Sequence, residues 1–274
     1  YYIEVRNDVK NPYTYSFFIE NNDGDFVKVD EENFAAQAKK LFKGYNAMTS
    51  KLGKKDFNLK NLDRMVEDYK ITLDIPKNYK IASSMELEGN TLSVKGYDLL
   101  AESPLICSDS LQHGTYEVDG ITFHLWFQGG CKPDWEKLNK DFTAFTKSQI
   151  KHFGGFPVDE YHYFFQITPY RSYHGVEHTK NTVLLLGPGE EIMDKRYEDL
   201  LGVCSHELYH TWNIKSIRPV EMYPYDYTKE NYFRTGFVAE GVTTYMGDMM
   251  LYNSGVFNWK EFAKTQNQNL ERHL

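Results

Sequence analysis

The chain has 274 residues, of which 41% are hydrophobic and 26% charged, so it can bury a core and intrinsic disorder is not expected. Its formal net charge is -8 and it has no basic block, which argues against a nucleic-acid partner. No apolar run reaches the roughly 18 residues that a spanning helix needs, so we expect no membrane span.

Three cysteines, Cys107, Cys131 and Cys204, form neither an even set nor a CxxC pair. A disulfide framework and a cysteine zinc site are therefore not expected. At least one free thiol fits a reducing compartment, and we expect a cytoplasmic protein. The chain starts with Tyr1 and not with Met, so a periplasmic location is the alternative if a signal peptide has been removed.

The first half of the chain is expected to be mainly β. Alternating runs at Tyr2–Val5 and Tyr13–Ile19 flank an Asn-Pro turn and predict a hairpin, and residues 31–43 have helical spacing. Strand-like runs follow from residue 70: ITLDIP, KIASSMEL, NTLSVKGY and GTYEVDGITFHLWFQGG. The last run turns at Val118-Asp119-Gly120, which predicts a second hairpin. The Gly129–Pro133 cluster is the expected boundary between an N-terminal mainly-β domain (1–132) and a second domain (133–274).

The second half mixes helices with strands. Asp134 can cap a helix whose apolar spacing continues to Gly154, and strands are expected at 161–168 and 182–187. Further helices are expected at 194–211 and 237–252, with a long irregular connection between them. The expected fold class is α+β.

The sequence HELYH at residues 206–210 carries the clearest chemistry. On a helix, His206 and His210 lie one turn apart on one face, as two imidazoles must to hold one zinc ion, with Glu207 beside them. A catalytic zinc needs a third protein ligand and a position for water. Glu240 is the expected third ligand, and Asp248, two turns further along, is its competitor for a ligand or supporting role.

In this hypothesis one Zn²⁺ per chain polarises the water and the scissile carbonyl. Glu207 takes a proton from the water and delivers it to the leaving amine. The alternative interpretation is that the two histidines belong to an ordinary amphipathic helix and that Glu240 is a solvated carboxylate.

A second informative stretch, Ser172–His178, lies between the two expected strands. Gly175 would let a substrate backbone approach closely, and Gly175 and Val176 on an edge strand would bind an extended peptide by β-addition. Glu177 would then supply an anion for a free amino terminus. The alternative is a polar turn in which Gly175 only permits a bend.

The segments HELYHTWNIKSIRP and DYTKENYFRTGFVAEGVTTYMGD resemble the glycyl aminopeptidase family of zinc metallopeptidases, whose members typically carry a PDZ domain. The resemblance extends to Gly175–His178 and more faintly to Glu102–Leu105 and Asn11-Pro12. It implies a thermolysin-like catalytic domain of the gluzincin type, with a mixed sheet and active-site helices, behind an N-terminal β domain. It also implies zinc ligands at His206, His210 and Glu240, the general base at Glu207 and an amino-terminus anchor at Glu177.

Since the chain ends at Leu274 without a PDZ domain, we expect a fragment truncated at its C-terminus. A tyrosine that stabilises the oxyanion would then lie beyond it; Tyr245 is available for this role, although its spacing from Glu240 favours packing behind the site. Arg218 is expected to fix the connection after the zinc helix rather than to contact substrate.

The expected function is a zinc-dependent aminopeptidase that removes small N-terminal residues, Gly or Ala, from peptides. A zinc endopeptidase of the same fold is the first alternative, and a non-catalytic peptide-binding relative is the second.

Overall fold

The computed structural model describes residues 6–8, 11–20, 26–29, 36, 37, 40, 68–223, 225–227 and 229–271. The chain divides into two compact units, one of Tyr1–Tyr69 with Val94–Asp98 and one of Lys70–Ser93 with Leu99–Leu274. In the first unit β1 (Arg6–Asp8), β2 (Asn11–Glu20) and β3 (Phe26–Val29) form an antiparallel sheet in that order. Most of the helix expected at 31–43, and the run Tyr2–Val5, lie outside the described residues.

Short strands continue the β-rich part of the chain. β4 (Asp68–Thr72), β7 (Thr91–Lys95) and β6 (Glu86–Glu88) form one sheet in that order, and β5 (Lys80–Ser83) pairs with β8 (Leu105–Ser108) in another. The run KIASSMEL thus divides into two strands that belong to different sheets. Helix α3 (Tyr97–Ala101) and strand β8 were not predicted, because elements of five and four residues are too short for a periodic pattern.

A five-stranded mixed sheet is the centre of the second unit, with the order β12-β13-β11-β10-β9. Its strands are β9 (Gln112–Val118), β10 (Ile121–Gly129), β11 (Glu160–Ile167), β12 (Ser172–Glu177) and β13 (Asn181–Gly187). β10, β11 and β13 are parallel, and β9 and β12 are antiparallel to their neighbours at the two edges. The predicted hairpin at Asp119-Gly120 is confirmed, and both residues have the positive φ of a tight hairpin turn, 52° and 80°.

The predicted helix after Asp134 is α4 (Trp135–Phe153), which connects the parallel strands β10 and β11. The Asp134 side chain accepts a hydrogen bond from the Lys137 amide at 3.1 Å, and Gly154 ends the helix in the left-handed conformation. Since β10 and β11 pair directly, the boundary expected between residues 132 and 133 passes through one continuous sheet. The divisions between the compact units lie further toward the N-terminus, the last of them at residue 98.

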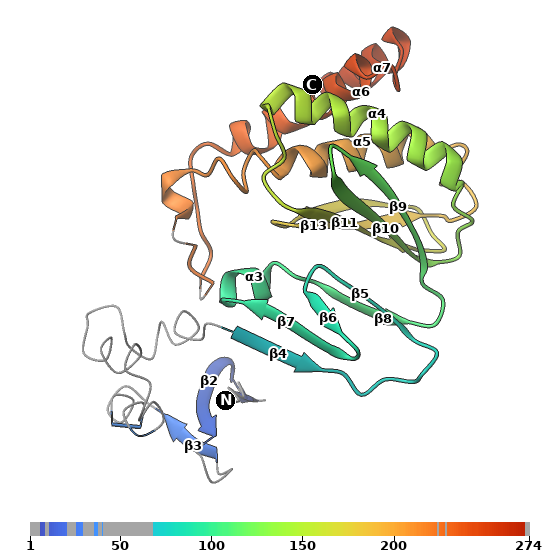
Figure 1. Cartoon of the computed structure of the whole chain (residues 1–274). Helices are drawn as coiled ribbons and strands as arrows, with labels where there is room; N and C mark the ends of the chain where they lie inside the picture. The colour runs from blue at the N-terminus through green and yellow to red at the C-terminus, as the bar shows by residue number, and fades with distance from the viewer. Residues whose placement is uncertain are drawn as a thin grey trace. The chain divides into compact units, whose positions relative to one another are not determined.

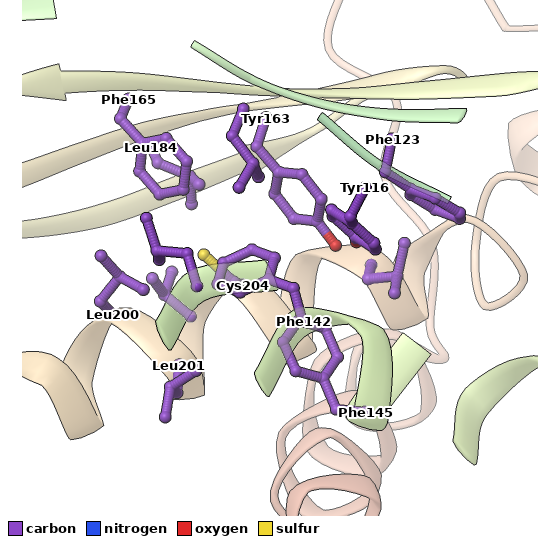
Figure 2. Packing of buried hydrophobic residues seen from close by; sticks show 14 of the residues in the cluster. Tyr116, Phe123, Phe142, Phe145, Tyr163, Phe165, Leu184, Leu200, Leu201 and Cys204 are labelled. Atoms are coloured by element: carbon purple, nitrogen blue, oxygen red, sulfur yellow. The ribbon is translucent and has the colours of Figure 1, made fainter. Parts of the chain in front are cut away.

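Side chains alternate between the two faces of this sheet, as strand geometry requires. Figure 1 shows α4 and α5 (Tyr197–His210) on one face and β5 and β8 on the other. Figure 2 shows the helix-side core, where Phe123, Tyr163 and Phe165 meet Phe142 of α4 and Leu200 of α5. On the opposite face, Phe164 packs with Ala82 and Leu111. The central strands are buried on both faces, as parallel strands usually are.

The C-terminal part is helical. A π-helical turn η3 (Phe237–Val242) continues into α6 (Thr243–Asn253), and α7 (Trp259–Glu271) follows. A β-rich N-terminal part followed by a mixed sheet with helices confirms the predicted α+β fold class. In the part of the chain that the structure describes, no helix has the length and apolar character needed to span a membrane.

Candidate active site

The three predicted zinc ligands converge at one point. His206 and His210 lie on α5, and their Nε2 atoms are 2.9 Å apart. Glu240, in the π-helical turn, places Oε2 at 3.4 Å from His206 Nε2 and 3.7 Å from His210 Nε2. Two imidazole nitrogens and one carboxylate oxygen that converge on one point form a typical ligand set of a catalytic zinc site.

The hydrogen bonds of His210 orient it for metal binding. Its Nδ1 lies 2.8 Å from the backbone carbonyl oxygen of Asn213. The carbonyl accepts a hydrogen bond from Nδ1–H, so the Nε2 atom of the imidazole keeps its lone pair for a metal. Burial, followed by the nearby His206, lowers the pKa of His210 below its usual value, so the imidazole is neutral, as a metal ligand must be. The residues present therefore fit a zinc ion.

Close packing between α5 and α6 brings Glu240 to the histidines. A Cβ atom added at Gly247 would lie 3.1 Å from the backbone of His206, so a larger residue would push the two helices apart. Ser205 donates a hydrogen bond to the Gly247 carbonyl at 2.7 Å. The Asn213 side chain donates to the Val238 carbonyl at 2.9 Å and to Thr243 Oγ1 at 3.0 Å, on either side of Glu240 in the sequence.

Glu207 is a buried carboxylate beside the predicted metal site. Only 4% of its surface is exposed, and its Oε2 has no hydrogen-bond partner. Burial and the nearby charges of Glu177 and Glu240 raise the pKa of Glu207 well above its usual value. A carboxylate with a raised pKa can both accept and release a proton near neutral pH, as the role of general base requires.

Gly175 lies against this carboxylate. A Cβ atom at position 175 would lie 2.1 Å from Glu207 Oε1 and 2.6 Å from its Cδ. Gly175 was predicted to let a substrate backbone approach closely, and the structure shows that the Glu207 side chain occupies the space that a larger residue would need.

The Ser172–His178 stretch is mainly strand and not a polar turn. β12 is an edge strand of the five-stranded sheet, and it lines a cleft of about 1080 Å³ together with α5 and Glu240. Tyr173 and Gly175 face α5, and strand alternation puts Glu177 on the same side. Carboxylate oxygens of Glu177 and Glu207 and a ring nitrogen of His210 lie within 4.8 Å of one another. Val176 also lines the cleft.

The three residues considered for supporting roles at the site, Asp248, Tyr245 and Arg218, lie in different surroundings. Asp248 lines the cleft and accepts a hydrogen bond from Gln266 at 3.0 Å, but it does not join the group of potential ligands formed by His206, His210 and Glu240. Tyr245 is not among the residues that line the cleft, and its ring packs against Phe262 of α7. Arg218 is exposed and donates to the Lys215 carbonyl at 2.6 Å, so it contacts its own loop.

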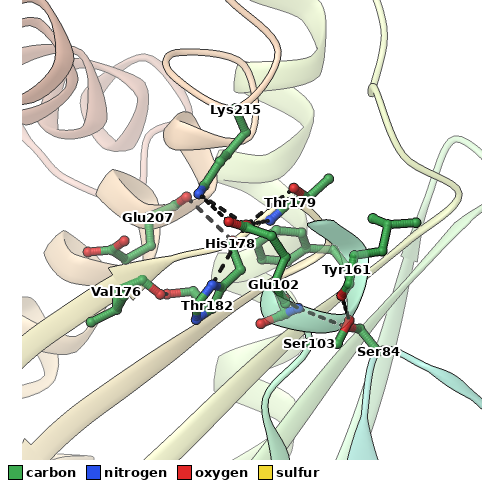
Figure 3. A network of polar contacts seen from close by, with 12 residues as sticks. Ser84, Glu102, Ser103, Tyr161, Val176, His178, Thr179, Thr182, Glu207 and Lys215 are labelled. Atoms are coloured by element: carbon green, nitrogen blue, oxygen red, sulfur yellow. Dashed lines mark hydrogen bonds and ion pairs between the residues drawn. The ribbon is translucent and has the colours of Figure 1, made fainter. Parts of the chain in front are cut away.

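Sequence reasoning did not find the role of Glu102, which Figure 3 shows in a polar network. The Glu102 carboxylate accepts hydrogen bonds from Lys215 Nζ at 3.1 Å and from the Thr179 amide at 2.9 Å. Lys215 follows α5, and Thr179 lies in the turn after β12. Glu102 thereby links these two segments through hydrogen bonds, and Thr179 lies only two residues after Glu177. The resemblance of Glu102–Leu105 to a family motif was the available signal, but it did not name the partners.

Comparisons with known proteins indicate the class of protein that this chain resembles. Residues 199–274 match the family model described as M61 glycyl aminopeptidase. This segment contains most of α5, the connection after it and the last helices, so the match supports the peptidase class and confirms the family resemblance found in the sequence. No curated protein sequence matches the chain.

Among solved structures, an aminopeptidase N family protein from Idiomarina loihiensis is similar, with a TM-score of 0.68 and 24% identity over 75% of this chain. An M1 zinc metallopeptidase from Deinococcus radiodurans matches with a TM-score of 0.45 and 16% identity over 74% of the chain. The first similarity shows a shared fold. The chain spans 37% of the length of the Idiomarina protein and 44% of the Deinococcus protein.

Proposed function

We propose that the chain carries the catalytic site of a zinc-dependent aminopeptidase that removes small N-terminal residues from peptides. The observation that carries this proposal is the convergence of His206, His210 and Glu240 beside the buried carboxylate of Glu207. The family match over residues 199–274 supports the peptidase class independently of these distances.

The residues have separate roles in this proposal. His206, His210 and Glu240 would hold zinc, which supplies Lewis-acid polarisation of a water and of the scissile carbonyl. Glu207 accepts a proton from the attacking water on its carboxylate and donates it to the nitrogen of the leaving amine. Gly175 leaves room for this carboxylate, and burial keeps its charge poorly solvated.

Glu177 supports the choice of an aminopeptidase over an endopeptidase. Its carboxylate lies at the end of an edge strand that can pair with an extended peptide, and within reach of Glu207 and His210. A protonated amino terminus paired with Glu177 would put the first peptide bond near the predicted zinc position. A preference for small residues follows from the family resemblance.

The Glu207→Gln variant tests the chemistry. We expect it to keep zinc and to lose at least about 10³-fold in kcat, because the amide cannot accept the proton from water. Zinc content and hydrolysis of alanyl p-nitroanilide are measured on the same preparation. Loss of zinc from the variant would contradict the role assigned to Glu207, and a wild-type chain that neither binds nor uses zinc would favour the non-catalytic peptide-binding alternative.

Blocking the substrate amine tests the exopeptidase specificity. Acetylation of a short peptide should lower kcat/KM by about 10²-fold or more in the wild type, and Glu177→Gln should remove most of that preference. Glu117→Gln, on the opposite edge strand β9, is the matched control and should keep it. Equal cleavage of blocked and free peptides by the wild type would favour the endopeptidase alternative.

A further inference from the structure

A second cluster of metal-ligating side chains lies on the face of the five-stranded sheet that does not carry α5. His124 of β10 pairs directly with His162 of β11, and Glu160 lies two residues before His162 on the same face. These residues lie away from the candidate active site, and its chemistry does not use them. We propose that His124, Glu160 and His162 form a second binding site for a divalent transition metal such as zinc.

Potential ligand atoms of the three side chains lie within 4.8 Å of one another, and the His124 and His162 rings are stacked, with centroids 4.4 Å apart and planes 9° apart. Glu160 Oε2 is 3.9 Å from His124 Nε2, and Glu160 Oε1 is 3.7 Å from His162 Nε2. These separations are too long for hydrogen bonds. Ligands at about 2 Å from a tetrahedral zinc are about 3.3 Å from one another, so each histidine nitrogen must approach its nearer Glu160 oxygen by about half an ångström. The two stacked rings must also tilt so that both Nε2 atoms face the ion.

His162 provides an independent sign of a missing partner. The residue is 4% exposed, and its Nε2 atom is buried without a hydrogen-bond partner. Leaving a buried polar atom unsatisfied is costly, and such atoms are few in folded proteins. This nitrogen points toward Glu160, the side on which a cation would bind.

Hydrogen bonds with neighbouring side chains orient both imidazoles, and of the two they leave only His124 with a free lone pair on Nε2. His124 Nδ1 lies 3.0 Å from His113 Nε2, so it can donate its proton to His113 and keep a lone pair on Nε2. Trp126 Nε1 donates to His162 Nδ1 at 3.2 Å, which leaves the imidazole proton on Nε2. Metal binding at Nε2 therefore requires the Nε2 proton to leave to solvent and Nδ1 to take up a proton, which breaks the Trp126 hydrogen bond.

The site is accessible from one side. The side chains of Glu160 and His124 are 39% and 20% exposed, whereas that of His162 is 6% exposed. A cation can enter past the carboxylate, and water can complete its coordination. A metal there would link β10 to β11 by side chains from both strands.

Zinc stoichiometry separates this site from the candidate active site. The purified chain is dialysed against Zn²⁺ at about pH 7 and its zinc content is measured. We expect about two zinc ions per wild-type chain and about one in Glu160→Gln and in His124→Asn, both of which keep peptidase activity. His152→Asn, an exposed histidine of α4, is the matched control and should still bind about two.

The active-site variant His206→Asn should retain about one zinc ion, which the double variant His206→Asn/Glu160→Gln should lose. Zinc should also change the fluorescence of the His206→Asn protein, and Trp126→Phe in that background should abolish most of the change, because Trp126 is the indole that loses a partner. A wild-type chain that binds one zinc ion, or Glu160→Gln and His124→Asn chains that keep the wild-type zinc content, would overturn the second site without affecting the proposed peptidase function.

Discussion

Replacing Gly175 by Ala should damage catalysis more than folding. The new Cβ would lie 2.1 Å from Glu207 Oε1, whereas ordinary contacts begin near 3.4 Å, so the carboxylate must move by about 1.3 Å. A displacement of that size in a reacting group costs about 10²-fold in rate, or about 2.7 kcal/mol of transition-state stabilisation. The clash is with a side chain and not with the backbone, so we expect the free energy of unfolding to fall by no more than about 3 kcal/mol.

The assay is kcat/KM with a free-amine alanyl substrate, accompanied by zinc content and thermal unfolding. Gly155→Ala is the matched control, because a Cβ at position 155 meets no atom within 4 Å. Gly175→Ala should keep zinc and lose activity, and Gly155→Ala should change neither. Wild-type activity in a folded, zinc-loaded Gly175→Ala protein would refute the inference that Gly175 positions the catalytic carboxylate.

Two further predictions concern the supports of the site. Asn213→Ala removes the hydrogen bonds to Val238 and Thr243 that hold the turn of Glu240. The Kd for zinc, measured by competition with a chelator, should therefore rise about 10–100-fold. An unchanged Kd would show that helix packing alone places Glu240. Glu102→Gln should lower the free energy of unfolding by about 3 kcal/mol near neutral pH, because Lys215 is left without its partner. Burial raises the pKa of Glu102, but His178 and Lys215 outweigh it and lower that pKa from 4.5 to about 2, so the stabilisation is complete above 4.5 and is lost as the pH falls toward 2. The difference in urea stability between wild type and variant should shrink over that range, and a constant difference would contradict the charge pairing.

Elements encoded by neighbouring residues could be predicted from the sequence. The Asp119-Gly120 turn, the Asp134 cap and the one-turn spacing of His206 and His210 each depend on residues at most four positions apart. Backbone preferences and helix periodicity act over this range. The hairpin, helix α4 and the two histidines on one face of α5 therefore appear where the sequence predicts them.

Pairing between distant segments could not be read in the same way. Alternation of side chains marks a strand but not its neighbour, so the parallel pairing of β10 with β11 across the expected boundary was not visible. The same limit applies to Glu102, whose partner Lys215 lies 113 residues further along the chain.

The sequence by itself determined the candidate donor residues His206 and His210, because their spacing and the family resemblance require no tertiary contact. Only the tertiary structure decided that Gly175 makes room for Glu207 and that His124 and His162 lie side by side on the sheet face opposite α5. Both arrangements depend on contacts between strands and helices that are far apart in the chain. Such contacts are set by packing of the whole core and not by local preference.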